Sequence, residues 1–330
     1  MDWVNILSNG VESFFGVEAV IYALAAIGLN VHFGYTGLLN FGQAAFLGVA
    51  AYGLATTIAT FGLPFFLGVA IGLVGAVILA LLLGVPTLRL RADYLAIVTI
   101  AAAEIVRLIF RSVTLRNVFG GSDGLQGFSD GFYALNPYPD GEYGIGPIAY
   151  NERTMWVLTV GWTLVILSCL LVFLLMRSPW GRVLKAIRED EDAVRSLGKN
   201  VFSYKMQALV LGGVLGSLGG FLFALARAAV QPDTFGTELT FFVYVVLILG
   251  GAARVLGPVL GAMIFWALLS LTDGILNSAV RAGNIPSQIL IGNQVGQVRF
   301  MLVGLGLMLL MIYRPQGIFG DRRELALDVR

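Results

Sequence analysis

The stretch RSPWGRVLKAIREDEDAVRSLGKNVFSYK, residues 177–205, is a charged segment that lies between two long apolar runs. The runs 155–176 and 206–230 are each long enough to cross a hydrocarbon core, which takes about 20 residues. Within the charged segment, apolar residues recur at helical spacing between a proline and a glycine that mark its ends: Val183, Ile187, Val194, Pro179 and Gly198. Short amphipathic helices on one face of a membrane protein offer a docking surface to a soluble partner. The segment therefore predicts a subunit of a multi-chain transport protein.

The composition is that of a multi-pass membrane protein. Of the 330 residues, 58% are hydrophobic and 12% are charged, whereas about 25% are charged in an average soluble domain. We predict an all-α transmembrane helix bundle, one domain over residues 1–330 with eight to ten membrane segments. The apolar segments lie near 17–32, 42–60, 65–84, 94–113, 155–176, 206–230, 239–253, 255–271 and 299–313. The neighbouring segments 239–253 and 255–271 fit one broken crossing, a re-entrant hairpin or two tilted helices.

The distribution of Lys and Arg predicts which loops face the cytoplasm. The charged segment 177–205 has seven basic residues, whereas the loop 114–154 has only Arg116 and Arg153. One span separates the two, so we expect the charged segment to be cytoplasmic and the loop to be external. The tail 314–330, and with it the C-terminus, then also lies in the cytoplasm. We expect no cleavable signal peptide, because the first 16 residues lack a basic start.

Catalytic, metal-binding and nucleic-acid-binding functions find little support. The net charge is +1 and no basic stripe is present, which argues against nucleic acid as a partner. Cys169 lies in an apolar run and is expected to be a small hydrophobe. No hydrolase or metalloprotease motif occurs, and Gly198-Lys199 is followed by Asn200 rather than by the Ser or Thr of a phosphate-binding loop. We expect this chain to bind no cofactor or metal, so any ATP hydrolysis requires another polypeptide.

The first candidate site is a set of charges inside an apolar segment. Glu104, Arg107 and Arg111 lie three and four positions apart, which puts them on one helical face. A charge within a span costs roughly 2.5–3.5 kcal/mol on insertion scales, so such groups pair or face a cavity. We favour a structural ion pair between Glu104 and Arg107, and the alternative is a direct part in a translocation path. Arg111 lies near the external interface, where snorkelling explains it.

The second candidate site is HFGYTGLLNFGQ, residues 32–43, which interrupts an apolar pattern. It fits either a broken helix whose freed backbone groups are satisfied locally, or an ordinary polar cytoplasmic turn. His32 is expected at the membrane interface rather than as a proton relay or metal ligand, because no second histidine exists. The residues predicted for a translocation path or an intramembrane pair are Tyr35, Thr36, Asn40, Gln43, Glu104 and Arg107.

Glycines inside the apolar segments form small-xxx-small steps, which let helix backbones approach closely in lipid. The longest run of such steps is Gly212, Gly216 and Gly220. We expect tight packing inside the bundle, and the alternatives are a subunit interface or a sliding surface. The stretch GGAARVLGP, residues 250–258, predicts a hinge or loop. Its expected hinge and packing residues are Gly250, Gly251, Gly257 and Pro258.

Four motifs, taken in order, resemble the membrane permease subunits of bacterial branched-chain amino acid ABC importers, specifically the M-type partner of the paired H- and M-type permeases. The motifs are GYTGLLNFGQAAFLGVAAYG (34–53), RADYLAIVTIAAAEIVRLIFR (91–111), WGRVLKAIREDEDAVRSLGKN (180–200) and VLILGGAARVLGPVLGA (246–262). The likeness covers about residues 20–320. Two differences from the family pattern are Phe119-Gly120-Gly121-Ser122 in the external loop and the alanine run 101–103. The alanine run bears on substrate identity more than on fold.

The resemblance implies a heteromeric importer in a bacterial inner membrane. It implies a second, H-type permease, two ATPase subunits that bind ATP and Mg²⁺, a periplasmic or lipid-anchored substrate-binding protein, and a surrounding layer of membrane lipid. The segment that it assigns to ATPase coupling comprises Arg188, Glu189, Asp190, Glu191, Asp192, Ala193, Leu197 and Gly198. The acidic run then meets basic residues on the ATPase, and the alternative is a solvated face.

Other functions compete with this one. The permease of a urea or short-amide importer is the nearer alternative, but that group tends to read Ser-Leu-Gly-His where this chain has Asn40-Phe41-Gly42-Gln43. A stand-alone secondary transporter or channel needs no docking segment and usually places coupling-ion carboxylates in its spans, where only Glu104 qualifies. An intramembrane enzyme is disfavoured by the missing catalytic motifs. Amino-acid import is therefore the preferred hypothesis.

Overall fold

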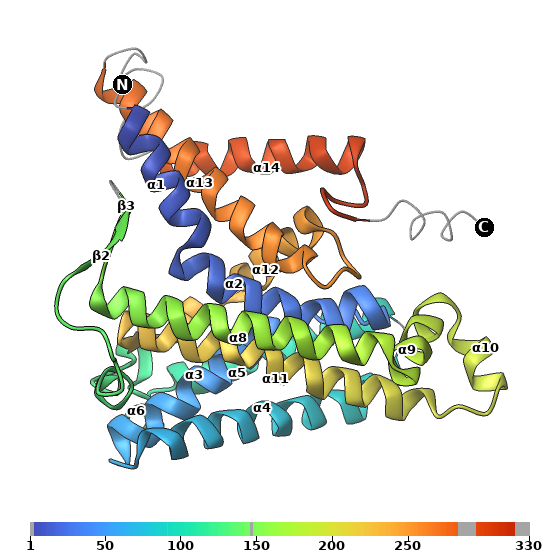
Figure 1. Ribbon diagram of the computed structural model, residues 1–330. Coiled ribbons are helices and arrows are strands. Elements are labelled where there is room, and N and C mark those ends of the chain that lie inside the picture. Colours follow the sequence, from blue (N-terminus) through green and yellow to red (C-terminus); the bar gives the residue numbers. More distant parts are fainter. Residues whose placement is uncertain (1–2, 91, 146–147, 283–294, 321–330) are drawn as a thin grey trace.

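The chain folds into a bundle of long helices (Figure 1) in a computed structural model that describes residues 3–90, 92–145, 148–282 and 295–320. Seven helical stretches in that part of the chain are long and apolar enough to cross a membrane. They are α1 (Trp3–Phe15) continuing through α2 (Val17–Leu29) and the π-helical η1 (Asn30–Tyr35), α3 (Gln43–Ala55) with the π-helical η2 (Thr56–Thr60), α4 (Phe65–Thr87), α8 (Glu152–Arg177), α11 (Val201–Arg227), α13 (Gly257–Arg281) and α14 (Val295–Tyr313). The predicted all-α bundle is confirmed.

Two further apolar helices correspond to the remaining predicted segments. They are α5 (Ala92–Arg111), which carries the charged face, and α12 (Thr237–Gly250). With 14 residues, α12 spans about 21 Å and is too short to cross a hydrocarbon core of about 30 Å by itself. A turn without helix joins it to α13, whose 25 residues are long enough. Of the three arrangements considered for this pair, two helices joined by a turn describes the backbone.

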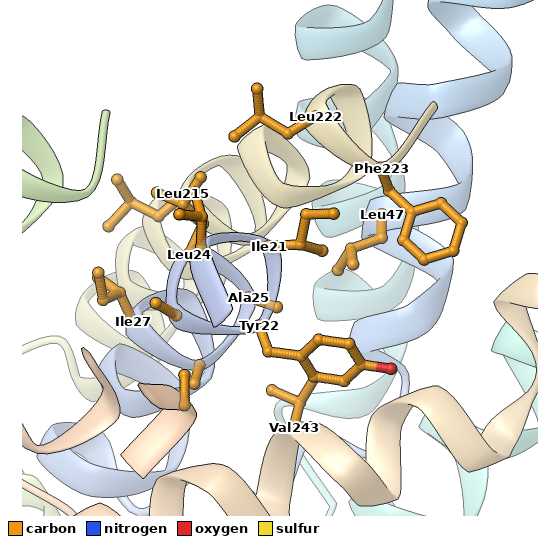
Figure 2. Packing of buried hydrophobic residues seen from close by; sticks show 14 of the residues in the cluster. Ile21, Tyr22, Leu24, Ala25, Ile27, Leu47, Leu215, Leu222, Phe223 and Val243 are labelled. Carbon is orange, nitrogen blue, oxygen red and sulfur yellow. The ribbon is translucent and has the colours of Figure 1, made fainter. Parts of the chain in front are cut away.

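The core of the bundle is α2, which is buried around its whole circumference from Ala19 to Leu29. Its sequence VEAVIYALAAIGL is apolar on every face, as expected for a helix surrounded by others. It packs against α11, α13, α8 and α12. Figure 2 shows Ile21 and Leu24 of α2 among side chains from three neighbouring helices: Leu47, Leu215, Leu222, Phe223 and Val243.

The helix α1 was missing from the sequence prediction, which began the first apolar segment at residue 17. Polar residues interrupt its apolar pattern, but it is amphipathic and its buried face packs along α13. Gly10 lies against Leu271, and the Ser270 hydroxyl donates to the Asn9 carbonyl at 3.1 Å. The N-terminal helix therefore belongs to the bundle.

The predicted external loop is a folded cap at the end of the bundle opposite α9 and α10 (Figure 1). It contains α6 (Arg116–Phe119), η3 (Gly121–Asp123), β1 (Leu125–Gln126), α7 (Asp130–Tyr133), β2 (Glu142–Ile145) and β3 (Ile148–Asn151). The strands β2 and β3 form an antiparallel hairpin, and β1 pairs with β4 (Ala229–Val230) in antiparallel register. Burial raises the pKa of the Tyr133 phenol, which therefore stays protonated and donates to the Leu225 carbonyl at 3.0 Å.

The Gly/Pro-rich stretch after α12 is a turn, as predicted. Gly251 has φ +109° and Ala253 has φ +58°, and Pro258 lies in the first turn of α13, where a missing N–H costs nothing. The chain returns to this turn after α14, since Ile318 N donates to the Leu249 carbonyl at 2.9 Å. Of the predicted tail 314–330, residues 321–330 lie outside the described part.

Candidate functional site

Residues 36–42 break the helix between η1 and α3 inside the protein. Gly37 adopts a left-handed φ of +72°, which favours glycine and ends the helical path. The polar side chains around the break are buried at 2% exposure or less: Asn30, His32, Thr36, Asn40 and Gln43. The broken-helix interpretation is confirmed, and the ordinary polar turn is wrong. His32 is fully enclosed by protein, so its ring faces neither lipid nor solvent, and its placement at the level of the membrane interface stays a prediction.

His32 is fixed by hydrogen bonds at both ring nitrogens. Its Nε2 lies 3.0 Å from the Leu209 carbonyl of α11, and its Nδ1 lies 3.1 Å from the Asn40 amide nitrogen. The amide nitrogen is a donor, so Nδ1 accepts and Nε2 carries the hydrogen that Leu209 receives. Gln43 Nε2 in turn donates to the Ala25 carbonyl at 3.2 Å. The neutral imidazole thus joins the break to α11, with neither nitrogen left for a metal.

Further bonds join the break to α12 and to the turn that follows it. The Tyr244 hydroxyl donates to the Asn40 carbonyl at 3.0 Å, and Ala44 N donates to Thr240 Oγ1 at 2.9 Å. The Asn30 side chain donates to the Arg254 carbonyl and accepts from Ala253 N, both at 2.8 Å. The sequence analysis did not single out Asn30, and only its polarity inside an apolar run could have signalled it. The break is therefore bonded to elements far away in the sequence.

The pathway residues predicted in this region lie inside the chain rather than on an open face. Tyr35 and Thr36 are 2% exposed, Asn40 is 1% exposed and Gln43 is 0% exposed. Three of them bond within the chain: the Thr36 hydroxyl donates to the Val31 carbonyl at 2.8 Å, Asn40 Oδ1 accepts from Gly42 N at 2.9 Å, and Gln43 Nε2 donates to the Ala25 carbonyl. A part for them in a translocation path stays a prediction.

The charges on α5 form a cluster on an open face of the chain. Arg107 Nε lies 3.1 and 3.0 Å from the two carboxylate oxygens of Glu104. Arg107 also donates to Asp233, a residue of η4 (Pro232–Phe235), and Arg111 Nη1 lies 3.3 Å from the same Asp233 carboxylate. Two acids and two bases thus form a neutral group. Apolar side chains beside it, including Ile105 at 59% exposure, also point outward.

Asp233 is the member of this cluster that sequence reasoning missed. It lies 126 positions from Arg107 in a short 3₁₀ turn, so no helical spacing relates the two residues. The expected Glu104–Arg107 contact is present, and it is one part of a larger group. Glu104 is 39% exposed and Arg107 is 16% exposed in the isolated chain. Whether the cluster holds the bundle together or contacts a substrate stays a prediction.

The charged segment 177–205 contains the amphipathic helices that the sequence predicted. They are α9 (Pro179–Glu189) and α10 (Glu191–Ser196). Ser178 caps α9 through Gly181 N at 3.5 Å, and Asp190 caps α10 through Ala193 N at 2.9 Å. Ile187 of α9 and Val194 of α10 form a small core with Val201, the first residue of α11.

The acidic run is largely engaged within the chain. Glu191 pairs with Lys205 and lies 2.8 Å from Arg195, and Asp192 also lies 2.8 Å from Arg195. Lys205 belongs to the long helix α11, so removing all four acids alters contacts of a spanning helix. The outermost apolar group is Leu197, at 79% exposure, ahead of Gly198 with φ +76°.

Helix α9 lies directly against the break. Arg188 donates from its guanidinium to the Gly34 carbonyl, and its Cγ lies 3.0 Å from the position of a methyl group on Gly37. The Lys185 ammonium lies 5.8 Å from the centre of the Tyr35 ring. A displacement of α9 therefore acts directly on η1.

The glycine steps pack inside the chain. A methyl group on Gly28 of α2 would lie 2.6 Å from Gly216 N, so the two backbones touch. Gly212 faces His32, and Gly220 faces the backbone of Leu47. The internal-packing interpretation is confirmed for Gly212, Gly216 and Gly220. The glycines after α12 are equally close, since Gly250 and Gly257 meet across the turn.

Comparisons with known proteins place the chain in a family. The family model described as branched-chain amino acid transport system, permease component, matches residues 13–313. The high-affinity branched-chain amino acid transport system permease protein LivM of Escherichia coli K12 is 31% identical over 327 residues, 96% of this chain and 71% of that protein. The probable LivM of Methanocaldococcus jannaschii is 27% identical over 92% of this chain and 91% of its own length. The ribose import permease protein RbsC of E. coli K12 is 28% identical over 67% of this chain and 73% of that protein. This multi-pass membrane protein belongs to the family of permease components of branched-chain amino acid transport systems.

Proposed function

We propose that this chain forms half of the translocation pathway of an ATP-driven importer for branched-chain or related hydrophobic amino acids. The names of two relatives that match more than nine-tenths of this chain support that substrate class. The structural observation that carries the proposal is the bond from Arg188 of α9 to the Gly34 carbonyl of η1. It connects a surface segment suited to docking with the buried break of the bundle. The chain itself binds no cofactor, and partner ATPases use ATP and Mg²⁺.

The contacts supply a route by which docking alters the bundle. Movement of α9 displaces Gly34, and the break passes the displacement to α12 through Asn40 and Tyr244. Helix α12 begins directly after η4, the turn that holds Asp233. A shift of α12 therefore moves η4 relative to the open face of α5. Two packed arrangements of these elements then correspond to two states of the pathway.

The surfaces of the chain suggest where its partners bind. Two ATPase subunits serve the importer, and one docks on α9 and α10, where Leu197 projects. A second, H-type permease faces the exposed side of α5 and completes the pathway. A periplasmic or lipid-anchored binding protein delivers substrate to the cap of residues 114–154. The complex lies in the bacterial inner membrane with the C-terminus in the cytoplasm.

A stand-alone secondary transporter is disfavoured by the state of Glu104. That carboxylate is held by Arg107 through two oxygens, so it is already paired and does not offer an open site for a coupling ion. The amide side chains of Asn40 and Gln43 bond within the chain, and they give no support for a urea or short-amide substrate.

The variant Arg188→Gln tests the proposed route. It removes the charged donor to Gly34, so the complex should still assemble with its ATPase while leucine uptake falls about tenfold or more. Arg314→Gln is the control, because Arg314 is an exposed arginine outside α9 and α10. Uptake of labelled leucine and of labelled urea into vesicles, normalised to assembled complex, gives the measurement. Normal uptake by the Arg188→Gln complex would contradict the coupling route, and urea uptake without leucine uptake would contradict the substrate class.

A further inference from the structure

A cavity of about 740 Å³ opens at the end of the bundle where α8 gives way to α9. Its walls come from α8, α9, the turn before α13 and the segment after α14. Most of the lining is apolar, and several of these side chains are exposed: Leu170 at 51%, Phe173 at 37%, Leu256 at 61% and Phe319 at 45%. An open apolar wall of this kind needs a covering partner.

The cavity also has a strongly basic rim. Arg177, Lys185 and Arg254 line it, and no carboxylate is among the described residues of its wall. The Arg177 guanidinium lies 4.0 Å from the centre of the Phe173 ring, and the Lys185 ammonium lies 5.8 Å from that of Tyr35. Both cations therefore lie within cation–π distance of an aromatic ring that also lines the cavity. The charge of the rim calls for an anionic occupant.

The position of the cavity along α8 identifies the kind of anion. Helix α8 has 26 residues and is about 39 Å long, enough to cross a bilayer from end to end. Arg177 is its last residue, and in a helix that crosses the bilayer from end to end this position falls near the lipid head groups, whereas Leu170 and Phe173 lie one to two turns deeper. A phosphate at Arg177 and Lys185 would thus continue into acyl chains that cover Leu170, Phe173 and Leu256.

We propose that this cavity is a binding site for an anionic phospholipid. Arg177 and Lys185 hold the phosphate, and the apolar wall of α8 and of the turn before α13 holds the acyl chains. A free phosphate ion would use the basic rim but would leave that wall uncovered. Basic pockets between membrane helices are suited to anionic head groups. The site stands apart from the transported substrate and does not depend on it.

Competition between two lipids tests the site in the assembled complex. The complex is purified from micelles that contain equal amounts of phosphatidylglycerol and phosphatidylcholine, and the retained lipids are measured by mass spectrometry. We expect wild type to retain phosphatidylglycerol in roughly fivefold excess or more. Arg177→Gln/Lys185→Gln should retain the two lipids equally. Arg182→Gln/Lys199→Gln removes the same charge at exposed positions outside the cavity and should behave as wild type.

Four results would overturn the proposal. Equal enrichment in the cavity variant and in wild type places the lipid elsewhere. Loss of the phosphatidylglycerol enrichment in both double variants would show that the enrichment depends on general surface charge and not on this cavity. Displacement of the retained lipid by millimolar inorganic phosphate would show that the basic rim binds a free phosphate ion rather than a phospholipid. Unchanged lipid retention together with loss of the ATPase from the cavity variant would mark a protein-docking surface instead. Normal leucine uptake by a variant that has lost the lipid leaves the proposed transport function intact while supporting the site.

Discussion

At the scale of single residues, Arg107 is the centre of the charge cluster because it bonds two carboxylates on different elements. Arg107→Met leaves Glu104 without its partner and should lower the stability of the complex by about 2 kcal/mol. Glu104→Leu leaves Arg107 with Asp233, so its cost should be about 1 kcal/mol or less. In the double variant Asp233 keeps Arg111, and most of the loss should be recovered. Thermal unfolding of the purified complex ranks the three variants.

The same variants separate a structural cluster from one that contacts substrate. If the cluster only holds α5 against η4, the Glu104→Leu/Arg107→Met complex should transport at close to the wild-type rate. Uptake is normalised to the amount of assembled complex, which removes any effect on folding. A double variant that is stable and assembled but does not transport would contradict the structural role that we favour.

At the scale of elements, the contact of α2 with α11 depends on glycine. A methyl group on Gly28 would lie 2.6 Å from Gly216 N and 2.9 Å from Gly216 Cα, and backbone atoms cannot move aside as a side chain can. Gly28→Ala should therefore separate the two helices at a cost of about 1–3 kcal/mol. Gly304→Ala in α14 is the control, since nothing lies within 4 Å of that position. Its stability should be unchanged or raised by up to about 1 kcal/mol.

These two variants are compared by thermal unfolding in the same detergent. An equal effect of Gly28→Ala and Gly304→Ala would show that α2 and α11 tolerate a wider separation, and close backbone packing would then not be what fixes their contact.

The tip of α10 provides a test of docking that leaves the rest of the chain intact. Leu197 is 79% exposed, so replacing it alters no packing within the chain. If an ATPase covers it, Leu197→Asp should weaken ATPase binding about tenfold or more, because burial of a leucine contributes about 1.5–3 kcal/mol. Leu135→Asp, exposed at the opposite end, is the control. Titration of the purified ATPase onto the permease in nanodiscs measures both, and equal affinities would remove Leu197 from the docking surface.

The elements were largely predictable from the sequence, and the partners of the buried polar groups were not. Pro179 and the apolar spacing predicted α9, and the polar run at 32–43 predicted the break, because such signals act over a few residues. The bonds from Asn30 to Arg254 and from Arg107 to Asp233 join residues 224 and 126 positions apart. Local periodicity contains no information about which helices become neighbours, so those contacts required the tertiary structure.

At the scale of the whole molecule, the cap and the helices α9 and α10 lie at opposite ends of the bundle (Figure 1). In a Cys169→Ala background, Gly141→Cys should react with a membrane-impermeant maleimide in intact spheroplasts. Lys199→Cys should react only after permeabilisation. Both positions are exposed, and the background chain contains no other cysteine. The reverse labelling pattern would contradict the predicted orientation, and it would place residues 314–320 on the external side as well.

The groups around Asn30 and His32 cannot be satisfied until most of the chain has been synthesised. Their partners include Leu209, Tyr244 and Arg254, the last of them 224 positions after Asn30. Peptide and amide groups without partners are not stable in hydrocarbon. During translation, the N-terminal third must therefore stay hydrated or in contact with the insertion machinery while the later helices emerge. A nascent chain that stops before α12 therefore has polar groups near its N-terminus without hydrogen-bond partners. We expect proteolytic quality control to degrade such a chain.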